Sequence, residues 1–309
     1  RDYYASRGLG DVYKRQDYSY NFAVRNFRHG SFGNITKIDN TRQVKNSESF
    51  FSVAAGMPLA HRGVFLIRAN GGHVNYRYDS DELFADDTDH SRYSFFGIKA
   101  ELARNTLDKF LYPRRGSDLK LSGIFVTGRD KYEPFDAEKF LSRTSRQWVG
   151  ARLTWDKYFD MPGCSWFSLG LNVDGVITNH PEFTTEGATV MSMPAYEPVP
   201  HAQMIYMPDF RGKRFAAGGV MPTFDLMPNF FLRTGFYAMF REKRSFVPGV
   251  SGPVEDKRWH YIAEASLVYH TPIGPVSLAL TKYDLRNWKN MYLTFNFGYA
   301  IFAPKGTFY

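Results

Sequence analysis

The strongest constraint on the fold of this chain is a two-residue alternation of apolar and polar side chains. In residues 289–302 the odd positions from 291 onward are apolar and the even positions are mostly small or polar. Successive side chains of a β-strand point to opposite faces, so this period predicts a strand with one apolar and one polar face. The odd set is Met291, Leu293, Phe295, Phe297, Tyr299 and Ile301, and the even set includes Asn290, Thr294, Asn296 and Gly298.

The same period recurs along nearly the whole chain and predicts about twelve β-strands. They cover 18–27, 48–57, 62–71, 92–104, 117–129, 146–159, 164–176, 212–224, 229–241, 258–271, 274–284 and 289–302. Of the 309 residues 17% are aromatic, but only 43% are hydrophobic. No apolar run approaches the roughly 20 residues of a membrane helix. These features indicate either an aromatic-rich soluble β-domain or a transmembrane β-barrel, whose apolar face is hidden by the alternation.

Strand length and the placement of aromatic rings favour the membrane. Most predicted strands have roughly ten or more residues, which is what a tilted membrane-spanning strand needs. On the apolar face of 258–271, Trp259 and Tyr269 lie ten positions apart. At about 3.3 Å per residue and a tilt of about 35–45°, roughly 25 Å separates them along the membrane normal. That is the height of the apolar band between the aromatic girdles of an outer-membrane barrel.

The predicted connections alternate between long and short. Every short connection contains proline, which presets φ for a turn and cannot donate to a strand ladder. This order places all tight turns at one rim of an antiparallel sheet. It predicts an all-β fold, an antiparallel up-and-down transmembrane β-barrel in the bacterial outer membrane with periplasmic turns and extracellular loops. The long connections are 28–47, 78–91, 130–145, 178–211 and 242–257; the short ones are 57–61, 112–116, 160–163, 227–229 and 271–274.

Charge and cysteine content narrow the range of partners. The net charge is +8, but the basic residues are scattered rather than clustered, so we predict no nucleic-acid partner. Cys164 is the single cysteine, which excludes an intrachain disulfide and a cysteine-based zinc cluster. We expect no cofactor and no metal ion. The expected partners are outer-membrane lipid, the barrel assembly machinery during insertion, and a second copy of the chain in a homodimer.

The start of the chain follows neither the strand nor the helix period. Residues 1–16 resemble translated sequencing-adapter sequence, so we expect a non-native or disordered lead segment there and a barrel domain over 17–309. The chain shows no signal peptide, which an exported protein needs, so we expect its natural start to be missing.

Three stretches resemble the bacterial surface antigen superfamily, which supplies the barrels of outer-membrane insertases and two-partner transporters. Residues 105–123, NTLDKFLYPRRGSDLKLSG, are similar to its Tyr-Pro-Thr-Arg-Gly motif, and 274–302 are similar to its last two strands. Residues 210–213 resemble its Val-Arg-Gly-Phe/Tyr tetrapeptide, with Lys213 in place of the aromatic residue. The implied sites are a periplasmic turn (Tyr112, Pro113, Arg114, Arg115, Gly116), a lumen-inserted loop (Phe210, Arg211, Gly212) and a C-terminal strand signal (Phe295, Phe297, Gly298, Tyr299, Phe302). In the family the loop arginine contacts the inner barrel wall.

Within that superfamily, residues 95–116, 126–134 and 270–280 are most similar to the C-terminal barrel of patatin-like phospholipases. That barrel has sixteen strands, so the resemblance implies that this chain is a C-terminal fragment. It also implies a membrane anchor and translocation domain of a patatin-like surface protein. The chain has no Gly-x-Ser-x-Gly nucleophile motif, so we expect no enzyme activity in the chain itself. The alternatives are an insertase or transporter barrel without a hydrolase, and a soluble aromatic-rich β-domain.

Other candidate chemistry has plainer explanations. His260, Ser266 and His270 share one strand face, but the alternation turns that face inward, where solvated lumen side chains are favoured over a catalytic triad. The acidic stretch 78–90 is favoured as a solvated loop over a cation site, and Arg114 and Arg115 as solvated turn residues over a phosphate cradle. The predicted lumen charges mix both signs, which suits a salt-bridged, partly plugged interior. They are Lys99, Glu101, Lys120, Arg152, Asp156, Asp174, Arg233 and Glu264.

Overall fold

Twelve antiparallel β-strands form one sheet. The computed structural model of the chain describes residues 15–28, 43–59, 62–79, 88–133, 142–161, 163–164, 166–184, 186–199, 202, 207–242, 258–272, 274–283 and 291–298. The strands are β1 (Arg15–Arg28), β2 (Gln43–Leu59), β3 (Gly63–Asp79), β4 (Thr88–Asn105), β5 (Gly116–Glu133), β6 (Ser142–Asp160), β7 (Phe167–Thr178), β8 (Arg214–Met227), β9 (Phe230–Arg241), β10 (Trp259–Thr271), β11 (Gly274–Tyr283) and β12 (Met291–Phe297). Two short helices, α1 (Glu186–Ser192) and η3 (Pro208–Phe210), lie between β7 and β8.

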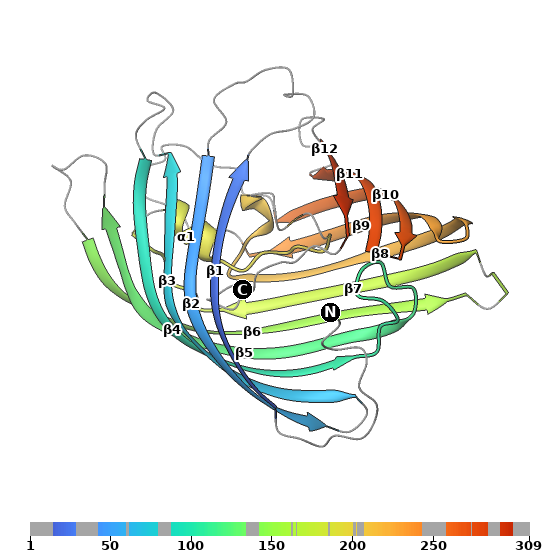
Figure 1. Ribbon diagram of the computed structural model, residues 1–309. Helices are drawn as coiled ribbons and strands as arrows, with labels where there is room; N and C mark the ends of the chain where they lie inside the picture. The colour runs from blue at the N-terminus through green and yellow to red at the C-terminus, as the bar shows by residue number, and fades with distance from the viewer. Residues whose placement is uncertain are drawn as a thin grey trace.

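Each strand pairs with the next one in the sequence, so the order from β1 to β12 is linear. The sheet curves into an open barrel with β1 and β12 at its edges, and no pairing joins these two strands among the described residues (Figure 1). The predicted all-β, up-and-down fold with about twelve strands is therefore confirmed. The boundaries differ in places, because β1 begins at Arg15, inside the expected lead segment, and β2 to β6 have 17 to 19 residues.

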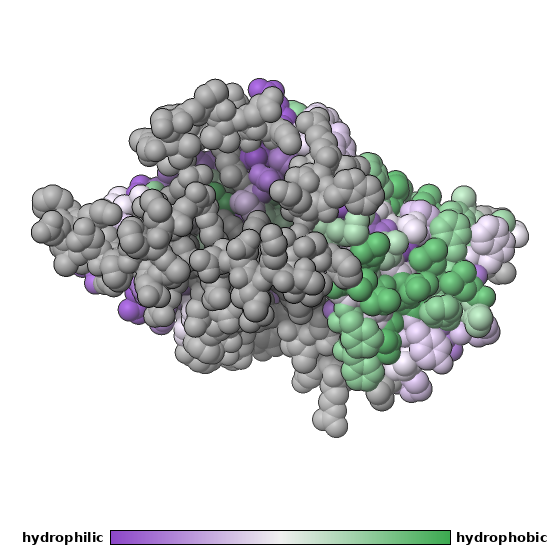
Figure 2. Space-filling model, turned by 90° about the horizontal axis from the view of Figure 1, so that it is seen from above, coloured by the Kyte–Doolittle hydropathy of each residue, from purple (hydrophilic) through white to green (hydrophobic). Residues whose placement is uncertain are grey.

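The two faces of the sheet differ as the alternation predicts. The convex face exposes large apolar side chains on every strand from β4 to β12, whereas the opposite face is mostly buried. Figure 2 shows part of the exposed apolar surface in green at the right of the molecule. The exposed set includes Phe96, Ile98, Leu102, Leu119, Leu121, Phe125, Val149, Leu153, Val173, Ile177, Val220, Phe236, Phe240, Trp259, Leu267, Tyr269, Leu278, Leu280, Leu293, Phe295 and Phe297.

Strand β6 shows why the strands are longer than their apolar rows. Its outward face is apolar at Val149, Leu153 and Trp155, but towards the start of the strand the same face carries Ser145 and Gln147. The ladder with β5 continues through this polar part. Backbone pairing does not depend on apolar side chains, so the strand extends beyond the apolar row.

The strand ends that the long connections join lie at the rim opposite the one with the short turns, as predicted (Figure 1). The turns after β2, β6, β8 and β10 are short. The connection after β4 differs, because β4 ends at Asn105 and β5 begins only at Gly116. The predicted tight turn at Tyr112–Gly116 is therefore wrong. Residues 112–115 end a longer segment, residues 106–115, which we call the rim loop, and Gly116 begins β5.

Gly116 joins the rim loop to β5 in a conformation that favours glycine. Its φ is 102°, and a Cβ at this position would lie 2.2 Å from the carbonyl oxygen of Thr106. Thr106 cannot easily retreat, because its amide donates to the carbonyl of Ser117 at 2.8 Å. The ends of the rim loop thus meet so closely that a side chain at residue 116 is excluded.

We expect Gly116→Ala to destabilise the folded chain more than Gly163→Ala does. Gly163 also has a positive φ, 87°, but nothing lies within 4 Å of a Cβ there. This control therefore measures dihedral strain alone, about 1–3 kcal/mol, and Gly116→Ala adds the contact with Thr106. Urea unfolding of the chain refolded in detergent micelles measures both losses. Equal losses of unfolding free energy in the two variants would mean that Thr106 moves away and leaves room for the new Cβ.

Candidate functional site: the filled lumen and its rim

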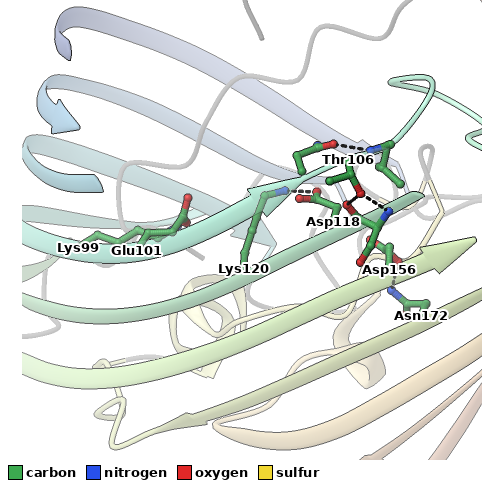
Figure 3. A network of polar contacts seen from close by, with 10 residues as sticks. Lys99, Glu101, Thr106, Asp118, Lys120, Asp156 and Asn172 are labelled. Atoms are coloured by element: carbon green, nitrogen blue, oxygen red, sulfur yellow. Dashed lines mark hydrogen bonds and ion pairs between the residues drawn. The ribbon is translucent and has the colours of Figure 1, made fainter. Parts of the chain in front are cut away.

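Paired charges line the concave face of the sheet (Figure 3). Three pairs of acidic and basic side chains lie within ion-pair distance on the inner wall of β4 to β7. Asp156 accepts a hydrogen bond from Asn172 Nδ2 at 2.8 Å in the same region. The predicted salt-bridged interior is confirmed for five of the predicted lumen charges, namely Lys99, Glu101, Lys120, Arg152 and Asp174. The pairs are Lys99–Glu101 at 2.5 Å, Lys120–Asp118 at 2.6 Å and Arg152–Asp174 at 2.6 Å.

The described residues of the connection between β7 and β8, within 179–213, lie inside the curve of the sheet (Figure 1). We call this connection the internal segment. Its residues from Ala188 to Tyr196 are all buried, although only 186–192 form α1. The internal segment therefore fills space that an empty barrel would leave to water. Neither of its short helices, nor any other helix among the described residues, has the length and apolar character of a membrane span.

Aromatic rings hold the first part of the internal segment against the wall. The Phe183 ring lies 5.1 Å from Tyr93 on β4 and 6.2 Å from Trp148 on β6, measured between centroids. The His180 ring lies 4.6 Å from Trp148. Both wall residues are 1% exposed. The inner wall is thus aromatic as well as polar at the place where the segment packs.

Polar contacts fix the internal segment at two further points. The Thr184 hydroxyl and amide both donate to Asp130 Oδ2 on β5, at 2.9 Å and 3.0 Å. The Tyr196 hydroxyl donates to Asn172 Oδ1 on β7 at 2.7 Å. A hydrogen bond to a charged group contributes about 1.5–3 kcal/mol when it is buried. These contacts specify one position of the segment, which apolar packing alone would leave free to slide.

Arg211 is buried at 5% exposure and holds the internal segment to itself. Its Nη1 donates to the carbonyls of Met191 at 2.9 Å and Met193 at 3.2 Å, and its Nη2 lies 3.9 Å from Glu197. These contacts lie at the end of α1 and just after it. The contact with the inner barrel wall that the family resemblance implied stays a prediction. The guanidinium supplies the donors that the carbonyls at the end of this short helix lack.

The two neighbours of Arg211 pack against the wall. The Phe210 ring lies 5.6 Å from His260 on β10 and 5.7 Å from Tyr283 on β11. A Cβ at Gly212 would lie 3.6 Å from the Cβ of Arg241 on β9. The three residues of the predicted loop motif therefore lie together inside the barrel, with the ring and the glycine against the strands.

The rim loop reaches across the barrel mouth. Tyr112 is 6% exposed, and its hydroxyl donates to Ser277 Oγ on β11 at 2.9 Å. Its ring packs edge-on against Phe231 on β9, and the Arg233 guanidinium lies 5.6 Å from the ring centroid. Burial raises the pKa of the Tyr112 hydroxyl above its usual value, so it remains a donor at neutral pH. A loop that starts at β4 is thus attached to the strands on the other side of the sheet.

The two arginines of the rim loop have different surroundings. Arg114 Nη1 lies 2.6 Å from Asp225 on β8, and its guanidinium lies 5.9 Å from the centre of the Phe231 ring. Arg115 pairs with Asp160 at 3.0 Å, and its side chain is 72% exposed. The expectation of two solvated turn arginines is wrong for Arg114 and fits Arg115. The position of Arg114 adds a second attachment of the loop to the far strands.

The other candidate residues fall in separate places. Phe295 and Phe297 are exposed on β12, and Gly298 has a φ of 77°, while Tyr299 and Phe302 lie outside the described residues. The Ser266 hydroxyl donates to Glu264, and His260 Nε2 accepts from Arg241 Nε at 3.0 Å, so these residues do not form the arrangement of a triad. The side chains of 78–89 also lie outside the described residues.

The sequence offered one signal of the internal packing. Trp148 and Tyr158 fall on the polar parity of 146–159, and both are buried against other parts of the fold. A large ring at an inward position indicates that something apolar covers it. The attachments of Tyr112 and Arg114 left no such local signal, because their partners are more than a hundred residues away.

No protein-family model and no curated protein matches this sequence. Among solved structures, the crystal structure of BamA from Haemophilus ducreyi lacking POTRA domains 1–3 aligns with 91% of this chain and 69% of its own, at 10% identity and a TM-score of 0.40. The β-domain of the Bordetella autotransporter BrkA aligns with 90% of this chain and 94% of its own, at 10% identity and a TM-score of 0.36. Both similarities are low, so they carry no part of the functional argument below.

We expect the bond between Tyr112 and Ser277 to contribute measurably to stability. Tyr112→Phe and Ser277→Ala should each lower the free energy of unfolding by about 1 kcal/mol, the usual net value of a buried hydrogen bond. The double variant should lose little more than either single variant, since both remove one interaction. Urea unfolding in detergent gives the three values. Fully additive losses would contradict a direct bond.

Acid should weaken the attachment of the internal segment through His180. Burial lowers the pKa of His180 from 6.5 to about 3. A backbone hydrogen bond at Pro181 raises this pKa and the charge of Lys213 lowers it, but both effects are smaller than that of burial. The folded state therefore prefers the neutral ring, and its stabilisation is complete above pH 6.5 and is lost as the pH falls towards 3. At about 1.4 kcal/mol per pH unit, the loss at pH 5 is about 2 kcal/mol.

His180→Phe is the matched variant, because it keeps a ring against Trp148 but does not titrate. The difference in unfolding free energy between pH 7 and pH 5 should be about 2 kcal/mol larger in the natural chain than in this variant. An equal pH dependence in the two proteins would mean that His180 is hydrated in the folded state.

Proposed function

We propose that this chain is an outer-membrane β-barrel domain that anchors a bacterial surface protein and serves its translocation. The observation that carries the proposal is the continuous apolar row on the convex face, set over a concave face of paired charges. A soluble sheet buries its apolar face and exposes its charged one, and this sheet does the opposite. Only lipid offers an outer environment in which this arrangement is favourable.

The height of the apolar band supports a membrane span. On β6 the outward row extends from Val149 to Phe159, ten positions along the strand, and is apolar except at Lys157 near its tight-turn end. At about 3.3 Å per residue and a tilt of about 40°, this is roughly 25 Å along the barrel axis. The strand register aligns the band between neighbours, because Leu102, Leu121 and Leu153 are successive ladder partners.

Aromatic pairs mark both ends of the band where β9 and β10 meet. The Phe240 and Trp259 rings lie 5.1 Å apart near the long-loop rim, and the Phe230 and Tyr269 rings lie 6.4 Å apart near the tight-turn rim. Amphipathic rings at both interfaces are typical of transmembrane barrels. Together with the alternation of loop lengths, they support a bacterial outer-membrane location with the tight turns in the periplasm. Insertion would then need the barrel assembly machinery.

The filled lumen favours an anchor over an open channel. The internal segment is attached by Asp130 and Asn172 on the wall, and the rim loop is attached by Ser277 and Asp225. Both segments would have to leave their positions before a polypeptide could pass. We therefore propose that translocation, where it occurs, accompanies insertion rather than continuing afterwards.

The finer assignment to a patatin-like surface protein rests on the resemblance of residues 95–116, 126–134 and 270–280. This assignment implies further barrel strands that complete the sheet beside β1, because the unpaired backbone groups of an open edge are unfavourable in lipid. The coding sequence upstream of residue 17 tests it. A Gly-x-Ser-x-Gly motif there supports the hydrolase anchor, and periplasmic repeats without that motif support the insertase or transporter alternative. The homodimer stays a prediction.

Charge substitutions on one strand face test the membrane span. Leu153→Arg places a cation in the middle of the apolar row and should reduce stability in lipid vesicles by about 2–4 kcal/mol. Gln147→Arg places the same side chain on the same exposed face beyond the row and should cost about 0–1 kcal/mol. Denaturant titration of the vesicle-inserted variants measures the difference.

If the chain is instead a soluble β-domain, we expect neither arginine substitution to change its stability. An exposed leucine in water is replaced by arginine at almost no cost, so both variants would then behave like the natural chain. A chain that stays monodisperse in buffer and does not enter vesicles would overturn the barrel proposal.

A further inference from the structure

We propose that a cavity at the tight-turn mouth of the barrel binds a phosphate group. The cavity has a volume of about 420 Å³ and lies between the rim loop and the turn that joins β8 to β9. Lys109 and Arg114 line it from the rim loop, Asp225 from β8 and His270 from β10. It lies at the end of the barrel opposite the long loops and apart from the internal segment.

The charge of the lining favours an anion. Two of its side chains, Lys109 and Arg114, are basic and one is acidic, while His270 supplies a ring nitrogen. The single carboxylate, Asp225, already accepts Arg114 Nη1 at 2.6 Å, so its charge is compensated. Lys109 is exposed at the mouth. The lining of the cavity therefore carries a net positive charge, which attracts phosphate.

Two buried nitrogens at the cavity have no hydrogen-bond partner among the described residues. They are Arg114 Nε and His270 Nε2. A buried polar atom without a hydrogen-bond partner is destabilising by about 1–3 kcal/mol. Both side chains line the cavity, so a small rotation presents either nitrogen to a ligand there. Phosphate oxygens are the acceptors that a guanidinium and an imidazole N–H bind best.

Two sources could supply the phosphate, a phospholipid headgroup of the inner leaflet or a free phosphate in the periplasm. Trp166, Leu226 and Met227 also line the cavity and are 56%, 52% and 66% exposed. These apolar side chains at the rim suit the glycerol and acyl part of a lipid. Both sources offer the same chemistry to Lys109, Arg114 and His270.

Binding would also hold the rim loop in place. Lys109 and Arg114 belong to the loop, whereas His270 and Asp225 belong to the strands across from it. A phosphate between them links the loop to β10 in addition to the Tyr112–Ser277 bond. Occupancy therefore stabilises the closed mouth.

The test uses the full chain refolded in neutral dodecyl maltoside micelles and titrated with inorganic phosphate. We expect a saturable change in tryptophan fluorescence, because Trp166 lines the cavity, and we expect Trp166→Phe to abolish it. Lys109→Ala and His270→Gln should each weaken binding at least tenfold, because each removes one ligand of the anion but leaves the contacts of Tyr112 and Arg114. Sodium chloride at matched ionic strength should give no change.

Arg115→Ala is the control variant, since Arg115 lies in the same motif but does not line the cavity. Its phosphate affinity should equal that of the natural chain. Nanodiscs of phosphatidylcholine with and without phosphatidylglycerol separate the two sources. Loss of the phosphate response when phosphatidylglycerol is present identifies the lipid headgroup as the ligand, and an unchanged response identifies free phosphate.

Two results would overturn the proposal. One is the absence of any saturable phosphate response in micelles. The other is a response that Lys109→Ala, His270→Gln and Arg115→Ala reduce equally, which would indicate general attraction to a basic rim. Neither result would affect the barrel proposal, which depends on the convex face.

Discussion

The backbone hydrogen-bond ladder is the constraint on which the rest of this structure depends. In lipid no water is available to satisfy a free amide or carbonyl, so each strand must pair along its whole membrane-spanning length. Continuous pairing forces successive side chains to opposite faces, and a slip of one residue would exchange the faces. On β6 such a slip would turn Leu153 into the lumen and Arg152 into the lipid. The alternation along the chain therefore records the register as well as the fold.

The same register creates a problem inside the barrel, because it directs charges and aromatic rings to a concave face. Burying an unpaired charge is strongly unfavourable, and burying a paired one is tolerated. On the inner wall the charges are paired, as in Arg152–Asp174, and the internal segment covers the rings of Tyr93 and Trp148. Filling the lumen with a connection between two strands satisfies the inner wall without any second chain.

The sequence predicted the strands well because their signal is local. Alternation between residues two positions apart predicts about twelve strands and the outward set from Phe96 to Phe297. The lengths of the connections between these strands predict the two rims. The interpretation of Tyr112–Gly116 as a tight turn failed because Pro113 and Gly116 are equally suited to the end of a longer loop. For Arg211 the motif indicated a place inside the barrel but not the carbonyls of Met191 and Met193, because a sequence motif does not specify the partners of a guanidinium.

By itself the sequence determined an antiparallel meander with an apolar outer face, because alternation, proline turns and strand length act over a few residues. Only the tertiary structure decided what occupies the interior and the mouth. The bond from Tyr112 to Ser277 spans 165 positions, and the contacts of Thr184 with Asp130 span 54. Such contacts depend on the curvature of the whole sheet, which brings distant strands within reach of one loop. No local period encodes that distance, so the closed mouth and its basic cavity were visible only once the sheet had been folded.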